Sequence, residues 1–307
     1  MASLKEIKGR IGSVKGTLKI TSAMKLVASA KLRKAQQAVQ AMTPYEERLH
    51  GILSALMTDY AAKVARGVLT PSAGPADAFT APRPAVRRVA LVAVSSNSSL
   101  CGGFNANVVR ELFAAIRAWE ESGAEVTVIP VGRKVADAVR KVGFPVSDPR
   151  LKLSERPTYD GAAALADELT DGYLDGRFDR VECIWNHFVS TATQQVRREA
   201  FLPLAGLPGA DGTAVSGSPA ALRGDYIVEP STVEEVRLLL PKVLKINIYT
   251  LLLDSSAAEH AARTVAMQTA TDNGEDLLAD LTLEYNKGRQ QKITSEILDL
   301  VGGSFDR

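Results

Sequence analysis

The chain has 307 residues, of which 46% are hydrophobic, and a formal net charge of +2. This is enough chain to bury the core of one large domain or two ordinary ones, and the near-neutral balance excludes a protein that is basic throughout. Cys101 and Cys183 stand far apart without a CxxC pair, which excludes a disulfide scaffold or a zinc site and indicates a reducing compartment. The sequence contains neither an apolar run long enough for a membrane span nor the apolar region of a signal peptide, so we expect a soluble bacterial protein without direct membrane insertion.

The N-terminal segment predicts a long helix, residues 1–66, with a coiled-coil seam. Steps of three and four residues from Leu4 reach eleven positions, nine of them apolar, and the exceptions are Thr21 and Lys25. The same spacing continues past Pro44, so the proline is expected to kink the helix or end it. The seam positions are Leu4, Ile7, Ile11, Val14, Leu18, Thr21, Lys25, Ala28, Leu32, Ala35 and Val39.

Residues 67–85 are rich in proline and glycine and lack periodicity, which predicts a linker. Residues 86–230 then alternate short apolar runs with helical patterns, which is typical of a Rossmann-like α/β domain with a mostly parallel sheet. The insertion Ala205–Ala221 is expected to be irregular. The predicted strands are Val89–Val94, Val126–Val131, Val181–Val189, Gln195–Leu202 and Tyr226–Val228; the predicted helices are Val108–Trp119, Val135–Val142 and Ala162–Leu174.

The last segment, residues 231–307, predicts a second long helix. Ser231 or Thr232 is the expected N-cap, and Pro241 is expected to kink the helix or mark its true start. From Ala257 to Ser304 the apolar residues follow helical spacing, and Gly302-Gly303 is expected to end a rod of about 65 Å. A rod of that length needs a partner helix, and part of it is expected to face another molecule.

The charges of the two ends are complementary. Residues 1–40 carry nine Lys or Arg against Glu6 alone, a net charge of +8, whereas residues 257–307 carry nine acids against five bases, a net charge of −4. We therefore expect the terminal helices to form an antiparallel coiled coil, with the α/β domain inserted between them. A basic helix also fits nucleic acid. However, the N-terminal helix has no aromatic residue before Tyr45, and its apolar seam is already used in packing against the C-terminal helix. We therefore expect no nucleic-acid partner.

The loop Ser95–Asn105, SSNSSLCGGFN, occupies the strand-to-helix position where α/β folds bind phosphates. It matches neither GxGxxG nor GxxxxGK[ST]. The three histidines, His50, His187 and His260, are scattered and are more simply structural or surface residues. We expect no catalytic residues, no cofactor and no metal in this chain.

Three motifs carry a resemblance to a known family. They are the N-terminal IKGRIGSVKGTLKITSAMKLVASAKLRKAQ, the internal SLCGGFN and the C-terminal EHAARTVAMQTATDNG…LEYNKGRQQKITSEILDLVGGS. Together they resemble the gamma subunit of the rotary F-type ATP synthase. That resemblance implies a central rotor shaft that couples ion-driven rotation of a membrane ring to ATP synthesis or hydrolysis in a catalytic ring. The implied partners are the alpha and beta subunits, the epsilon subunit and the membrane c-ring, and the implied location is peripheral, on the cytoplasmic face of the inner membrane.

The resemblance also assigns residues. It implies that Arg289, Gln290 and Thr294 contact beta subunits and that Met24 and Arg263 affect coupling. It places Cys101 and Gly102 in a base loop that approaches a beta subunit.

The sequence departs from the family at three places. Ser98-Ser99 replace a basic residue and glycine, Gly288 and Ser304 each replace an alanine, and we expect Gly288 to let the rod flex before its contact residues. Two other classes remain open: a nucleotide-binding α/β enzyme with a helical oligomerisation stalk, and a coiled-coil adaptor that binds nucleic acid.

Overall fold

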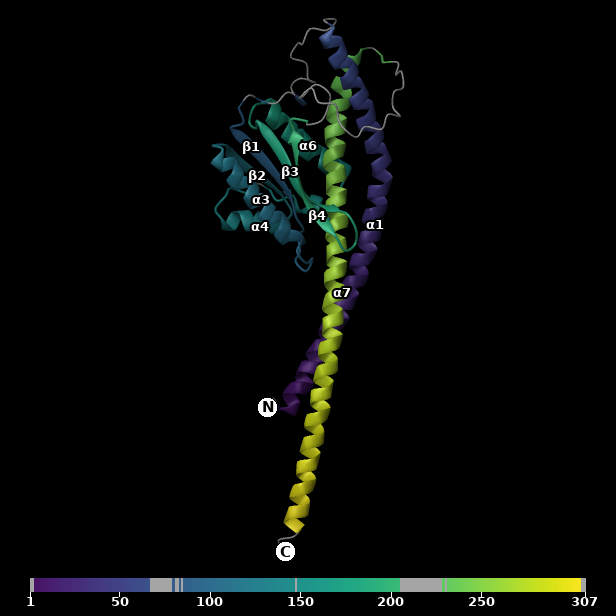
Figure 1. Ribbon diagram of the computed structural model, residues 1–307, viewed down its shortest axis with the longest axis vertical. Coiled ribbons are helices and arrows are strands. Elements are labelled where there is room, and N and C mark those ends of the chain that lie inside the picture. Colours follow the sequence, from purple (N-terminus) through teal and green to yellow (C-terminus); the bar gives the residue numbers. More distant parts are fainter. Residues whose placement is uncertain are drawn as a thin grey trace. The chain divides into compact units, whose positions relative to one another are not determined.

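The computed structural model describes residues 3–66, 79–80, 83, 85–146, 148–204, 228–229 and 231–304. Contacts divide the chain into two compact units, Met1–Ala30 with Arg263–Arg307 and Lys31–Ala262, and each is described by itself. Two long helices run through both units: α1 spans Leu4–Ala65 and α7 spans Thr232–Ser304 (Figure 1). Strands and shorter helices lie between them in sequence, which confirms the predicted fold class of two terminal helices with an inserted α/β domain.

A four-stranded sheet forms the centre of the unit 31–262. Its strands are β1 (Arg88–Val94), β2 (Glu125–Val131), β3 (Arg180–Phe188) and β4 (Gln194–Leu202), in the order β2-β1-β3-β4. β1 is parallel to both β2 and β3, which confirms the mostly parallel sheet, whereas β4 is antiparallel to β3. The tight turn at Ser190–Thr193 joins β3 to β4 and dictates that direction, because a parallel neighbour needs a longer crossover.

Alternate residues of β1 face opposite layers of this unit. Val89, Leu91 and Ala93 pack with helices α3 (Phe104–Glu121) and α4 (Arg133–Lys141), which lie on one face of the sheet (Figure 1). Ala90, Val92 and Val94 belong to the core on the other face, with α6 (Tyr159–Leu174). The five-residue helix α5 (Leu151–Glu155) was not predicted from the sequence.

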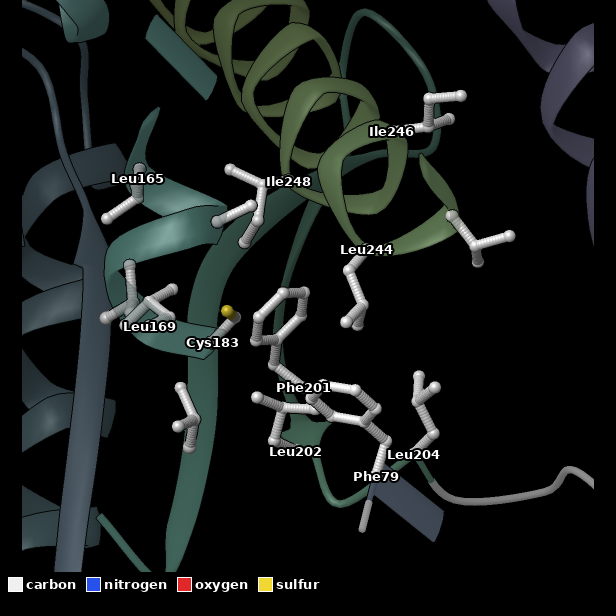
Figure 2. Close-up of a cluster of buried hydrophobic side chains, with 14 of the residues drawn as sticks. Phe79, Leu165, Leu169, Cys183, Phe201, Leu202, Leu204, Leu244, Ile246 and Ile248 are labelled. Carbon is white, nitrogen blue, oxygen red and sulfur yellow. The ribbon is translucent and has the colours of Figure 1, made fainter. Parts of the chain in front are cut away.

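The core on the α6 face also receives side chains from both long helices. Leu244 and Ile248 of α7 face Phe201 of β4 and Leu165 of α6 (Figure 2). Leu53 and Met57 of α1 are buried in the same cluster. In this unit α6 and the two long helices therefore pack on the same side of the sheet.

The start of α7 and the prolines of the long helices decide one question that the sequence left open. Ser231 caps α7, since its Oγ accepts a hydrogen bond from the Glu234 amide at 3.3 Å, and the helix continues through Pro241 as α1 does through Pro44. Pro241 therefore does not mark the start of the helix. The glycine pair predicted to end α7, Gly302-Gly303, is itself helical, and the described helix reaches Ser304, the last residue of the predicted rod. Glycine disfavours a helix by only about 1 kcal/mol per residue and does not by itself end one.

Several predictions fall outside the described residues. These are the insertion Ala205–Ala221, all but Val228 of the strand Tyr226–Val228, and most of the linker 67–85. Val228 itself is not in a strand. The domain limits 1–66, 67–85, 86–230 and 231–307 stay a prediction.

Candidate partner-binding surface

In the unit formed by residues 1–30 and 263–307, α1 and α7 pack antiparallel. Leu4 lies over Gly288 and Leu18 over Gly274, so fourteen residues forward along α1 match fourteen back along α7. A Cβ added at Gly274 would lie 2.7 Å from Leu18 Cδ2, and one at Gly288 would lie 3.1 Å from Leu4 Cδ2. The missing side chains let the leucines approach the α7 backbone, and the predicted antiparallel pairing is confirmed within this unit.

At the two seam positions that are not apolar, Thr21 and Lys25, the two helices make polar contacts. The hydroxyl oxygens of Thr21 and Thr271 are buried and hydrogen-bonded at 3.1 Å. One turn further along α1, Lys25 Nζ donates to Gln268 Oε1 at 2.9 Å. Each exception therefore has a polar partner on α7. The predicted coupling residue Met24 is half-buried beside these polar contacts.

The three residues predicted to contact a partner lie together on α7. Arg289, Gln290 and Thr294 are all exposed, and the Thr294 hydroxyl donates to the Gln290 carbonyl at 2.9 Å. The guanidinium of Arg289 and the amide of Gln290 present planar sets of donors suited to carboxylates and carbonyls. Ile293 stands between them on the same stretch and is also exposed.

Large aliphatic residues are exposed along both helices of this unit. Leu283 is 73% exposed on α7 and Leu26 is 69% exposed on α1. Scattered apolar residues are ordinary on a surface, but these recur over several turns and flank the polar contact residues. The others are Ile20, Val27, Val265, Leu277, Ile293, Ile297 and Leu298.

The second predicted coupling residue, Arg263, does not lie with the contact residues. It is buried, with 9% of its surface exposed. It precedes Arg289 by 26 positions on α7, which corresponds to about 39 Å of helix. On α7 the predicted coupling residue Arg263 therefore lies apart from the three predicted contact residues.

The predicted base loop presents a different residue from the one expected. Cys101 is buried and packs with Ala258 and Ala262 of α7, whereas its neighbour Leu100 is exposed in the left-handed region, with φ 67°. Gly102 also has a positive φ, 56°, which suits glycine. The sequence singled out the cysteine. Leu100 could have been noticed as an apolar residue inside a polar loop.

The polar groups of this loop hold one another and the start of α4. Asn105 Nδ2 donates to Ser96 Oγ at 2.8 Å, and Asn105 Oδ1 accepts from the Ser96 amide at 3.0 Å. Asn97 Oδ1 accepts the amide of Arg133, and Ser95 Oγ accepts that of Val135. Together with the Lys134 amide, which donates to the Ser96 carbonyl, these bonds attach the start of α4 to the loop between β1 and α3.

Ionisable residues of the unit 31–262 form two groups that the sequence did not single out. Burial opposes ionisation of Glu182, but hydrogen bonds from Arg180, Arg198 and Trp119 outweigh it and hold the pKa of this carboxyl below its usual range. His50 and His187, expected to be structural or surface residues, are bonded to α7: His50 to Asn247 and His187 to Asp254, each at 2.8 Å.

Two searches of the described part of the chain bear on membrane and metal binding. No helix there is both long and apolar enough to cross a bilayer. The same residues contain no group of three or more His, Cys, Asp or Glu placed to hold a metal ion.

Comparisons with known proteins agree over the length of the chain. A family model described as ATP synthase matches residues 3–305. The ATP synthase gamma chain of Phocaeicola vulgatus is 50% identical over 307 residues, with 99% of this chain and 100% of the relative covered. The ATP synthase gamma chain of Flavobacterium johnsoniae is 43% identical, with 99% and 98% covered. In fold, the chain is similar to one from the central stalk and c-ring of the Tetrahymena thermophila mitochondrial ATP synthase, with a TM-score of 0.57, 23% identity, and 82% of this chain and 99% of that one covered.

Proposed function

The chain belongs to the ATP synthase gamma chain family, and from this premise we propose that it is the central rotor shaft of a rotary ATP synthase. In this role the shaft couples rotation of a membrane ring to ATP synthesis or hydrolysis in a ring of other subunits. Because the shaft is asymmetric, it favours different conformations at otherwise equivalent sites, and its rotation changes their affinities in turn. The findings favour this function over the nucleotide-binding enzyme.

One observation carries the proposal: the paired helices of residues 1–30 and 263–298 expose large aliphatic side chains over many turns while their seam is filled. Leu26 and Leu283 are more than two-thirds exposed, whereas elsewhere in the same unit Leu18 packs against Gly274 in the seam. A shaft that turns inside a sleeve of other subunits needs such an outer surface, because apolar contact is not directional and permits sliding. The two-helix unit is therefore suited to a surrounding partner.

We assign the polar contacts with the beta subunits to Arg289, Gln290 and Thr294. Met24, beside the polar contacts of the seam, and Arg263, buried in α7, are proposed to affect coupling through the packing of the two helices. The loop with Cys101 and Gly102 is proposed to face a beta subunit, with Leu100 as its exposed apolar contact. Catalysis is assigned to other subunits and requires no cofactor in this chain.

The proposed partners follow from this role. They are the hexamer of alpha and beta subunits around the paired helices, and the epsilon subunit and the c-ring at the α/β domain. The proposed location is the cytoplasmic face of the inner membrane, held there by the assembly.

The test of the function is a reconstitution. Purified alpha and beta subunits are assayed for ATP hydrolysis with and without the full chain, and the mixture is resolved by size. We expect one copy per hexamer to co-elute and the rate to rise. Failure to associate, together with ATP turnover by the chain alone, would favour the enzyme with a helical stalk.

The contact residues are tested in the same assay with a matched control. The double substitution Arg289→Ala with Gln290→Ala should lower ATP hydrolysis by the complex about tenfold or more, because charge-assisted bonds to a partner contribute about 1.5–3 kcal/mol each. The control, Lys287→Ala with Gln291→Ala, removes the same charge and the same amide from neighbouring exposed positions. Equal rates for the two double variants would refute the assignment.

A further inference from the structure

Asp254 of α7 binds the end of strand β3 through three hydrogen bonds. Its Oδ2 accepts from Trp185 Nε1 at 2.9 Å and is bonded to His187 Nδ1 at 2.8 Å, while its Oδ1 accepts from the Phe188 amide at 2.9 Å. The Asp254 side chain is 16% exposed. A single carboxylate thus gathers the donors of three residues within one short stretch of strand.

The geometry of these bonds fixes direction as well as distance. Trp185 and His187 are two positions apart on β3 and so project from the same face of the strand, and the third donor belongs to the main chain. Hydrogen bonds weaken steeply when they are bent, whereas apolar contacts tolerate sliding. Rotation of α7 about its own axis would therefore break the bonds at Asp254 before it separated neighbouring apolar surfaces.

A hollow interrupts the packing beside Asp254, so the hydrogen bonds of Asp254 contribute more to holding α7 against rotation relative to the sheet. A hollow of about 410 Å³ lies between α1, α7 and the strands β3 and β4. Asp254, Trp185 and His187 line it, together with Glu46 of α1 and Phe201 of β4. The hollow interrupts the apolar packing on this side of Asp254, so fewer apolar contacts resist turning of α7 there.

Other polar contacts of α7 in this unit are weaker or point elsewhere. Lys245 Nζ pairs with Asp167 of α6 at 2.9 Å, but the Asp167 side chain is half exposed. Asn247 bonds to His50 of α1, and Thr232 bonds to Asp59, also of α1. Among the interactions described for residues 31–262, Asp254 is the site where α7 makes three hydrogen bonds to the sheet.

Building on the proposed rotary function, we infer that Asp254 is the positioning residue that holds α7 at a fixed angle on the α/β domain and so sets the torsional stiffness of the connection between them. A neutral amide cannot replace it, because Asn has one acceptor oxygen and its NH₂ group would face a donor. Asp254→Asn should therefore soften the connection while leaving the apolar core of this unit in place.

The experiment measures angular fluctuations in the complete complex. The ring is immobilised and stalled with a non-hydrolysable ATP analogue, and a gold nanorod is attached to the thiol introduced by Lys141→Cys on α4. Both natural cysteines of this chain are buried, so the chain is labelled selectively at the new thiol before the complex is assembled. The variance of the rod angle is inversely proportional to stiffness. We expect it to increase about twofold in Asp254→Asn, since three charge-assisted bonds are weakened or lost.

Asp167→Asn is the matched control, because it makes the same chemical change in a more exposed residue, on α6, that pairs with Lys245 of α7. Its variance should equal that of the unsubstituted chain. Trp185→Phe, which removes one donor and keeps a ring, should give an intermediate variance, and this variant decides the question if Asp254→Asn does not assemble. An unchanged variance in Asp254→Asn and Trp185→Phe would overturn the inference. So would an increase in Asp167→Asn equal to that in Asp254→Asn.

A separate check tests the proposed function. The unsubstituted complex must rotate when ATP replaces the analogue, and failure to rotate would refute the proposal that the chain is a rotor shaft.

Discussion

Alanine substitutions at Gly274 and Gly288 are predicted to have opposite effects on the stability of the paired helices. In the interior of a helix, alanine is favoured over glycine by about 1 kcal/mol. At Gly288 the new Cβ would lie 3.1 Å from Leu4 Cδ2, the mobile end of a half-exposed side chain near the start of α1. A small shift of Leu4 relieves this contact. Gly288→Ala should therefore stabilise the unit by about 0.5–1 kcal/mol.

At Gly274 the same methyl group meets a more constrained neighbour. It would lie 2.7 Å from Leu18 Cδ2 and 3.2 Å from Leu18 Cγ, so the whole side chain or the helix itself must move. Overpacking of this kind costs about 1–3 kcal/mol, which exceeds the gain in helix propensity. We expect Gly274→Ala to destabilise the unit by up to about 2 kcal/mol.

Amide hydrogen exchange of the full chain measures both effects where they occur. Exchange is followed in peptides from residues 4–30 and 263–298, and a change of about 1.4 kcal/mol in the opening free energy alters protection about tenfold. Protection should rise in Gly288→Ala and fall in Gly274→Ala. In a chain that also carries Leu18→Ala, Gly274→Ala should become stabilising, because the contact is gone. Equal stabilisation by both single substitutions would refute the reasoning, since the leucines would then impose no constraint.

Three further predictions concern polar groups and are tested by urea unfolding of the full chain. Burial raises the pKa of Glu46, so its ionisation costs stability as the pH rises above the usual glutamate pKa of about 4.3. Glu46→Gln should therefore raise the urea midpoint of unfolding at neutral pH but not at pH 4. The control Glu47→Gln, at an exposed position, should change the midpoint at neither pH. Glu182 has a lowered pKa, so its contribution is present at neutral pH and lost as the pH falls; Glu182→Gln should cost about 1.5–3 kcal/mol at neutral pH and little in acid. Thr271→Val should cost about 0.5–1.5 kcal/mol, because the Thr21 hydroxyl keeps its bond to the Leu18 carbonyl and loses only the bond that joins the two helices; Thr21→Val should then cost less in this variant than in the unsubstituted chain, and additive losses would contradict this account.

The paired helices were largely predictable from the sequence because their signal is local. All eleven seam positions predicted for α1 are buried or half-buried, including Thr21 and Lys25. A heptad needs only the spacing of apolar residues along one helix, and that spacing is written in the sequence itself. The strands were found for a similar reason: Val89–Val94 is a short apolar run, as expected of a strand buried on both faces.

The sequence failed where a single residue or a distant partner decides the structure. Helix α5 has five residues and follows Arg150, which adopts a left-handed conformation that no local pattern announced. The partners of Asp254 lie more than sixty positions earlier in the chain, and neither an acidic residue in a helix nor a histidine near a strand end indicates that the two meet.

The division between local and distant information also separates the two kinds of residue to which we propose a function. Residues that would contact a partner, such as Arg289 and Gln290, are exposed and need no second segment of this chain to position them, so a motif can identify them. Residues that hold α7 on the sheet act through pairs that only the folded chain brings together, as Asp254 does with Trp185. A rotor requires both, since a contact surface transmits torque only as far as the shaft beneath it resists twisting. Substitutions that weaken the internal contacts should therefore impair performance under load while the contact surface remains intact.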